Sequence, residues 1–116
     1  MILAEPLSHP TTLGQLLEIG APQTTAIAAP DRPGLSYGDL RKTVARGAKA
    51  IGNIGVGRRD RIVIVLDNGP EAAVGFLAAA SAGVACPLNP GLTASEFEFT
   101  ISDLEARALI TAPGPS

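Results

Sequence analysis

The hydrophobic and polar positions form their most regular pattern between Ser36 and Ile54. Apolar residues recur there at spacings of three and four while basic residues take the other positions, which predicts an amphipathic helix of about five turns. Ser36 and Asp39 have the spacing of a capping box variant at its start. Gly55 follows the helix, and we expect it to adopt the left-handed conformation that commonly ends helices.

Three short apolar runs predict strands at 61–66, 84–88 and 107–111. The first, "RIVIVL", is β-branched without polar alternation, which is typical of a strand covered on both faces. Helical stretches after Asn68 and from Thr93 separate the three runs. We expect the first of these helices to be buried, because it is apolar nearly all round. Strands that alternate with helices predict a parallel, doubly wound sheet.

The two helices between the strands carry different start signals. Asn68 is the expected N-cap of the first, with Pro70 in its first turn and Glu71 complementing the helix dipole. Thr93 and Glu96 form a capping box at the start of the second. The apolar stripe of that second helix consists of Phe97, Ile101 and Leu104.

The start of the chain predicts a helix at Thr12–Ile19 and then a small hairpin at 23–37, with a tight turn at Pro33–Gly34. The predicted fold class is therefore α/β: a partial doubly wound parallel sheet of three βα units, 36–112, with a small N-terminal β-hairpin and helix. We interpret 1–116 as one subdomain, because a chain of this length builds a single core.

Composition refines this picture. The 116 residues are 46% hydrophobic, 17% charged and 3% aromatic, so the chain is too apolar for disorder and its core must be aliphatic. Basic and acidic residues are mixed, with a formal charge of −2, which disfavours nucleic acid and anionic membranes as partners. The longest uncharged stretch, 72–88, is rich in Ala and Gly, and we expect no membrane span. A single cysteine and an N-terminus without an export signal indicate a cytoplasmic location.

The sequence contains no catalytic constellation and no metal-binding pattern. Cys86 lies in a predicted buried strand without a neighbouring His or Lys, which favours a structural thiol, and His9 has no obvious companion. Gly52, Gly55 and Gly57 invite comparison with a nucleotide-binding loop. They follow a helix and precede a strand, which is the reverse of the phosphate-binding order, so they predict the end of a helix.

Two polar segments are open to more than one interpretation. Arg58, Arg59 and Arg61 predict a solvated turn, with an anion contact as the alternative. The Asn68–Glu71 turn lies at the carboxyl end of a strand, where open α/β sheets bind ligands, although helix capping explains it as well.

Several short motifs occur in a distinctive order along the chain. "LSY" opens the long helix, "GVG" and "DR" precede the first predicted parallel strand, "NGPE" follows it, and "PLNP" follows the next strand. In this order they resemble the start of the large N-terminal domain of the adenylate-forming acyl-CoA synthetases. The resemblance covers about residues 24–112, and the stretch from 87 to 111 looks most similar to the oxalate–CoA ligase-like branch.

The resemblance implies an enzyme that activates a carboxylate with ATP and Mg as an acyl-adenylate and transfers the acyl group to CoA. It also implies that the phosphate-binding loop, the acidic groups for ribose and metal, and the catalytic Lys lie downstream of this segment. We therefore expect the segment to bind no cofactor, to hold no catalytic residue and to be inactive alone, with the acyl substrate set elsewhere. Its candidates for lining the CoA approach are Asn89 and Pro90. Gly91 stands where some relatives carry a basic residue for a CoA phosphate, so that contact is not expected.

Two hypotheses about the role of the chain follow. The first is the N-terminal piece of such a ligase, whose partner is the remainder of the synthetase chain or a complementing chain. The alternative is a stand-alone α/β interaction module that docks a partner through its open sheet. Because a sheet of three strands exposes edges and apolar helix faces, we expect the isolated chain to self-associate.

Overall fold

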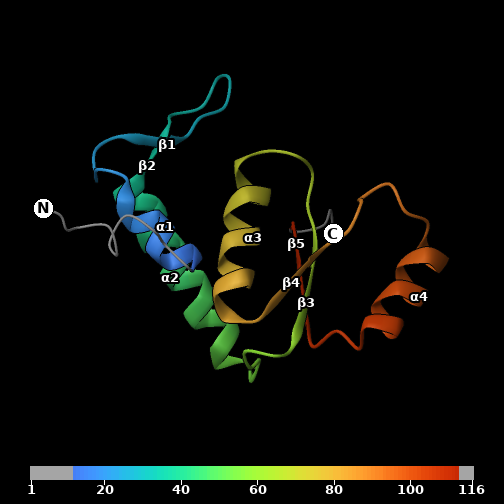
Figure 1. Cartoon of the computed structure of the whole chain (residues 1–116). Coiled ribbons are helices and arrows are strands. Elements are labelled where there is room, and N and C mark those ends of the chain that lie inside the picture. The colour runs from blue at the N-terminus through green and yellow to red at the C-terminus, as the bar shows by residue number, and fades with distance from the viewer. Residues whose placement is uncertain (1–11, 113–116) are drawn as a thin grey trace, which may run out of the picture.

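A computed structural model describes residues 12–112, which contain five strands and four helices. In chain order these are α1 (Leu13–Ile19), β1 (Thr25–Ile27), β2 (Leu35–Ser36), α2 (Tyr37–Asn53), β3 (Arg61–Val65), α3 (Pro70–Ala82), β4 (Val84–Pro87), α4 (Ala94–Leu104) and β5 (Ala108–Thr111). The predicted fold class is confirmed: β1 and β2 form an antiparallel hairpin, and the other three strands form a parallel sheet (Figure 1).

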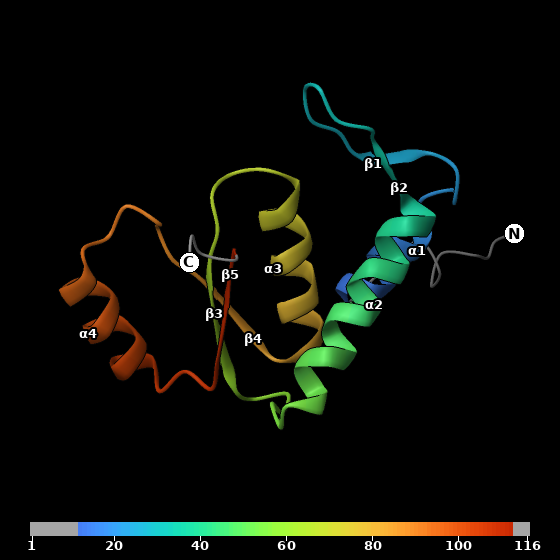
Figure 2. The same cartoon turned by 180° about the vertical axis from the view of Figure 1, so that it is seen from behind.

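The order of the parallel sheet, β4-β3-β5, explains where its helices lie. β3 is central, since Ile62 pairs with Ala85 on one side and with Ala108 on the other. The connection through α3 moves the chain to one side of β3, and the connection through α4 moves it back across β3. Right-handed crossovers in opposite directions place their helices on opposite faces of a sheet. Figures 1 and 2 show α3 and α4 on opposite sides of the strands, with α2 packed beside α3.

The core lies between β3 and the pair formed by α2 and α3. Ile62 and Val63 are fully buried and Ile64 is nearly so, which confirms that the β-branched run is covered on both faces. The two helices approach closely, because a Cβ atom added to Gly47 of α2 would lie 2.9 Å from the Cβ atom of Ala78 in α3. A small residue at each position therefore sets the spacing of this helix pair.

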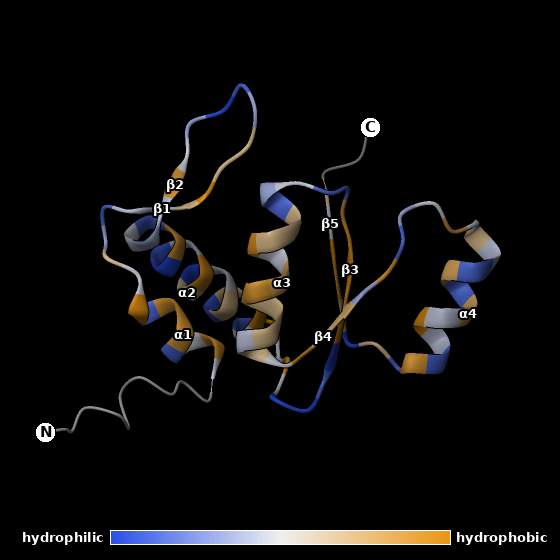
Figure 3. Ribbon diagram, turned by 45° about the horizontal axis from the view of Figure 1, so that its top comes forward, coloured by the Kyte–Doolittle hydropathy of each residue, from blue (hydrophilic) through white to orange (hydrophobic). Residues whose placement is uncertain are grey.

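Burial predictions for the elements around this core were wrong in part. α3 buries only Ala78 and Ala79, because α2 and the sheet cover one of its sides and Phe76 stays exposed on another. β4 is an edge strand, so Val84 is exposed and Cys86 is half-buried instead of lying in a buried strand. α4 has no buried residue. Its predicted stripe of Phe97, Ile101 and Leu104 is half-buried, and Figure 3 shows further hydrophobic positions along α4.

Most of the predicted helix ends are confirmed. Ser36 Oγ accepts a hydrogen bond from the amide of Asp39 at the start of α2, and Gly55 follows that helix with a φ of 96°. The capping box of α4 is complete: the Glu96 amide donates to Thr93 Oγ1 at 3.2 Å, and the Thr93 amide donates to Glu96 Oε1 at 2.8 Å.

Two local predictions about turns and caps were wrong. The N-cap of α3 is Gly69 and not Asn68: its φ of 153° is a conformation that glycine reaches freely, and no side chain caps the helix. Pro70 does occupy the first turn. The hairpin reverses at Pro30 and Asp31, where Asp31 has a φ of 62°, and not at Pro33–Gly34, which lies on the way into β2.

Candidate functional site

A cavity of about 480 Å³ lies where β3 and β4 end, and we call it the switch-point crevice. The loop after β3 leads to α3 on one face of the sheet, while the loop after β4 leads to α4 on the other face. Two neighbouring parallel strands whose connections leave on opposite faces create the crevice in which open α/β sheets bind ligands. Its wall includes Ile64, Leu66 and Phe76, and its rim carries Asp67, Asn68 and Asn89.

The loop after β4 brings the sequence-predicted residues to this crevice. The amide of Leu88 donates to the carbonyl of Ile64 at 2.8 Å, which continues the parallel pairing beyond the end of β4. Asn89 and Pro90 follow directly and line the crevice together with Asn68. Asn89 Oδ1 accepts a hydrogen bond from the Gly91 amide at 2.8 Å, an Asx turn that fixes the side chain. The suggestion that Asn89 and Pro90 line an approach of CoA stays a prediction.

The chemistry of the rim is suited to binding. Asp67 provides a carboxylate, and Asn68 and Asn89 provide amides, which recognise hydroxyl, amide or ammonium groups of a ligand. Cys86 does not line the crevice, and its thiol contacts the carbonyl of Val84 at 3.7 Å. Over residues 12–112, no three His, Cys, Asp or Glu side chains gather as a metal site.

Two clusters singled out in the sequence lie at the amino ends of the strands, on the side of the sheet away from the switch-point crevice. They are the glycines Gly52, Gly55 and Gly57 and the arginines Arg58, Arg59 and Arg61. The Gly55 amide donates to Gly52, and the Gly57 amide donates to Asp60 Oδ2 at 2.7 Å, so these glycines form a helix end and a turn, as predicted. Arg61 is exposed, as expected of the solvated turn, but it is the first residue of β3 and not part of the turn. Its guanidinium donates to the carbonyl of Leu104 at 2.8 Å and holds the last turn of α4 against the start of β3.

The remaining basic and histidine predictions have simple outcomes. Arg58 and Arg59 are exposed, in agreement with the solvated turn. His9 lies outside the described residues. None of the helices in the part of the chain that the structure describes is long and apolar enough to cross a membrane.

Sequence reasoning missed an ion pair that joins the hairpin to α3. Arg32 and Glu71 form two parallel hydrogen bonds, the first of them 3.0 Å between Nη1 and Oε1. The hydrogen bonds from Arg32 lower the pKa of Glu71 to about 2, and Glu71 raises the pKa of Arg32. No local pattern could have predicted the pair, because its partners come from separate elements far apart in the sequence.

Comparison with known proteins adds independent information. The family model described as AMP-binding enzyme matches residues 20–116. An acetyl-coenzyme A synthetase of Mycobacterium tuberculosis is 38% identical over 85 residues, which are 72% of this chain and 13% of that protein. A 3-hydroxybenzoate–CoA ligase of an Aromatoleum species is 33% identical over 99 residues, which are 78% of this chain and 18% of that protein.

Solved structures give the same picture at the level of the fold. Apo MatB from Rhodopseudomonas palustris superimposes with a TM-score of 0.79 and 28% identity, over 88% of this chain and 21% of that chain. The N-terminal domain of FACL13 from Mycobacterium tuberculosis superimposes with a TM-score of 0.78 and 25% identity, over 86% and 26%. The chain therefore spans about a quarter or less of the length of each of these relatives.

Proposed function

Because the chain belongs to the AMP-binding enzyme family, we propose that it forms the N-terminal part of an AMP-forming carboxylate–CoA ligase. The observation that carries this proposal is the family match across residues 20–116, which includes every strand of the parallel sheet. Acetyl-CoA and 3-hydroxybenzoate–CoA ligases among the relatives support the same reaction class, with ATP and CoA as cosubstrates. The single cysteine favours a cytoplasmic location for this enzyme.

In this proposal the segment is a scaffold, and its switch-point crevice faces the substrate CoA. Within residues 12–112 no three His, Cys, Asp or Glu side chains gather as a metal site, and we propose no catalytic step for this segment. Asn89 and Pro90 line the crevice, and the amide of Asn89 is a suitable group for the CoA arm. The adenylating residues and the carboxylate pocket belong to chain outside this segment.

The first experiment compares the 116-residue chain with the product as it is made in the native source, whose intact mass is measured by mass spectrometry. Carboxylate-dependent ATP–pyrophosphate exchange is measured on both, with oxalate, acetate and 3-hydroxybenzoate in the panel. We expect the 116-residue chain to be inactive and a longer native product to show exchange with at least one carboxylate. Robust exchange by the short chain would refute the claim that the adenylating residues lie elsewhere.

A second experiment on a longer product separates adenylation from transfer to CoA. Asn89→Ala is expected to leave pyrophosphate exchange unchanged and to raise the KM for CoA in thioester formation, because CoA takes part only in the second half-reaction. Gly52→Ala is a matched control, because a Cβ atom there meets no other atom within 4 Å. An unchanged KM for CoA would assign Asn89 to the scaffold alone.

The alternative function, an interaction module, is favoured by the exposed side chains of the sheet. Val84 on the edge strand β4 is 42% exposed, and Leu109 on the edge strand β5 is 53% exposed. A partner chain that completes the sheet, or a second copy of this chain, would cover them. Size-exclusion chromatography with light scattering on the isolated chain tests self-association. A monomer that is independent of concentration would count against a second copy as the partner and against the exposed sheet that we expect of a fragment.

A further inference from the structure

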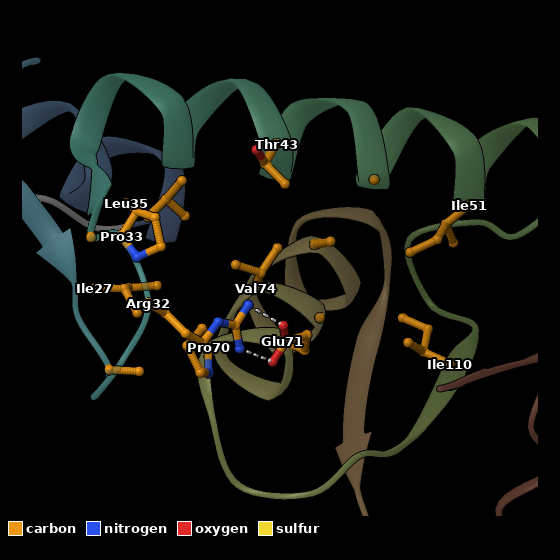
Figure 4. Close-up of a pocket in the computed structure, with 15 residues that line it drawn as sticks. Ile27, Arg32, Pro33, Leu35, Thr43, Ile51, Pro70, Glu71, Val74 and Ile110 are labelled. Atoms are coloured by element: carbon orange, nitrogen blue, oxygen red, sulfur yellow. Dashed lines mark hydrogen bonds and ion pairs between the residues drawn. The ribbon is translucent and has the colours of Figure 1, made fainter. Parts of the chain in front are cut away.

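A second cavity, which we call the hairpin cavity, lies away from the switch-point crevice. It has a volume of about 700 Å³ and is bounded by the hairpin loop 28–34, by α2, by α3 and by Ile110 of β5. Figure 4 shows Ile27, Leu35, Ile51 and Val74 around it, with Arg32 reaching across to Glu71. Its volume falls within the usual range of sites for small molecules.

The polar side chains of the hairpin cavity already have partners in the protein. Arg32 and Glu71 bind each other through two hydrogen bonds, and Thr43 Oγ1 donates to the carbonyl of Asp39 at 2.8 Å. The two charges of the lining therefore neutralise each other, and the remaining side chains are aliphatic or proline. A ligand with a charge would have no free counter-ion there, whereas an uncharged apolar molecule would lose little on leaving water.

The wall of the cavity formed by loop 28–34 is held by few interactions. The hairpin ladder consists of a strand of three residues and a strand of two, with an irregularity in its register. Within residues 12–112 the loop makes no hydrogen bond to α3 except those of Arg32 with Glu71. Short ladders and exposed contacts are typical of segments that open locally. The ion pair between Arg32 and Glu71 thus holds the loop to the first turn of α3.

We propose that the hairpin cavity binds a small, uncharged, apolar molecule, and that loop 28–34 closes around it through the Arg32–Glu71 pair. This proposal does not depend on the ligase function. It follows from the volume, the aliphatic lining and the internally paired charges of the cavity.

Binding is tested with Nile red, an uncharged apolar dye, on the 116-residue chain. We expect saturable binding at one site, with slower amide exchange in α2 and α3 around Thr43 and Val74, and weaker binding of the anionic dye ANS. Val74→Phe should weaken Nile red binding about ten-fold by filling the cavity. Phe99→Ser removes a 72% exposed ring on α4 and should change nothing. Binding that does not saturate, or that is lost with Phe99→Ser and kept with Val74→Phe, would overturn the proposal.

The role of the Arg32–Glu71 pair in holding loop 28–34 is tested by the rate at which Nile red is released. Arg32→Gln, Glu71→Gln and the double variant should each speed release about two- to five-fold, and by the same factor, because each removes the same exposed pair. Arg59→Gln, an exposed cation on a distant turn, is the matched control and should have no effect. In the unmodified protein, raising the salt concentration should speed release in the same direction. If the double variant released Nile red faster than either single variant, with additive effects, the pair would not hold the loop. The same conclusion would follow if none of the three variants changed the release rate.

Discussion

Substitution of Gly83 by alanine tests how tightly the start of β4 is fixed. Gly83 joins α3 to β4, and a Cβ atom there would lie 2.7 Å from the carbonyl oxygen of Asp60 and 3.0 Å from that of Gly57. Neither oxygen is free to move, because the Val84 amide donates to Asp60 and the Asp60 amide donates to Gly57. The new methyl group must therefore displace the first residue of β4 and its pairing with Arg61.

The expected cost combines two effects. Overpacking of a tight site costs about 1–3 kcal/mol, and the loss of one backbone hydrogen bond adds about 1 kcal/mol. We therefore expect Gly83→Ala to lower the free energy of unfolding by about 2–4 kcal/mol. The same substitution at Gly52 is the control, since this exposed position near the end of α2 has no atom within 4 Å of the added Cβ. Alanine there should stabilise the helix by about 0.5–1 kcal/mol.

Urea unfolding followed by circular dichroism measures both variants against the parent chain. Thermal midpoints should differ in the same sense, by about 4 °C for each kcal/mol. The decisive result is the opposite sign of the two changes. A Gly83→Ala variant within about 0.5 kcal/mol of the parent would show that the junction relaxes, and the argument from close backbone contacts would then be wrong.

Three further predictions concern side chains near the two cavities and on α4. Thr93→Ala removes the capping box and should speed amide hydrogen exchange in α4 about five-fold, as measured by mass spectrometry. The free energy of global unfolding should change little, because no α4 residue is buried. Glu71→Gln should lower the urea midpoint at neutral pH. Because Arg32 depresses the pKa of Glu71 from 4.5 to about 2, the difference from the parent should be complete above pH 4.5 and vanish as the pH falls through about 2. Asn89→Ala should lower the unfolding free energy by about 1 kcal/mol in urea titrations, whereas Asn89→Asp, which keeps the acceptor for the Gly91 amide, should not.

The parts of the fold that the sequence predicted are those fixed by local physics. The periodicity of α2, the β-branched run of β3 and the box formed by Thr93 and Glu96 each depend on neighbours within a few residues. Alternation of strands and helices then constrained the sheet to parallel pairing, because the connections are too long for hairpins and the crossovers are right-handed. The rule that open α/β sheets bind ligands at the carboxyl ends of their strands located the Asn68–Glu71 turn, whereas Asn89 was named from the family resemblance.

The errors come from interactions between distant residues or from competition between adjacent ones. Asn68 has the right chemistry for an N-cap, but Gly69 reaches a φ that starts the helix one residue later. The burial of α3 and β4 was overestimated, because their apolar composition does not reveal that β4 is an edge strand or that α2 and the sheet cover only one side of α3. The pair of Arg32 and Glu71 depends on how the hairpin docks on α3. That packing cannot be predicted from either segment alone.

The position of β3 in the middle of the sheet has a consequence during protein synthesis. Its two neighbours are both made after it, and Ala108, the partner of Ile62, follows roughly 45 residues later, which takes about 2–9 s at ribosomal speed. Throughout that delay the segment "RIVIV" has an open edge and cannot be covered by β5. Such a segment favours intermolecular strand pairing, so the nascent chain should depend on chaperones that bind β-branched apolar stretches until β5 emerges.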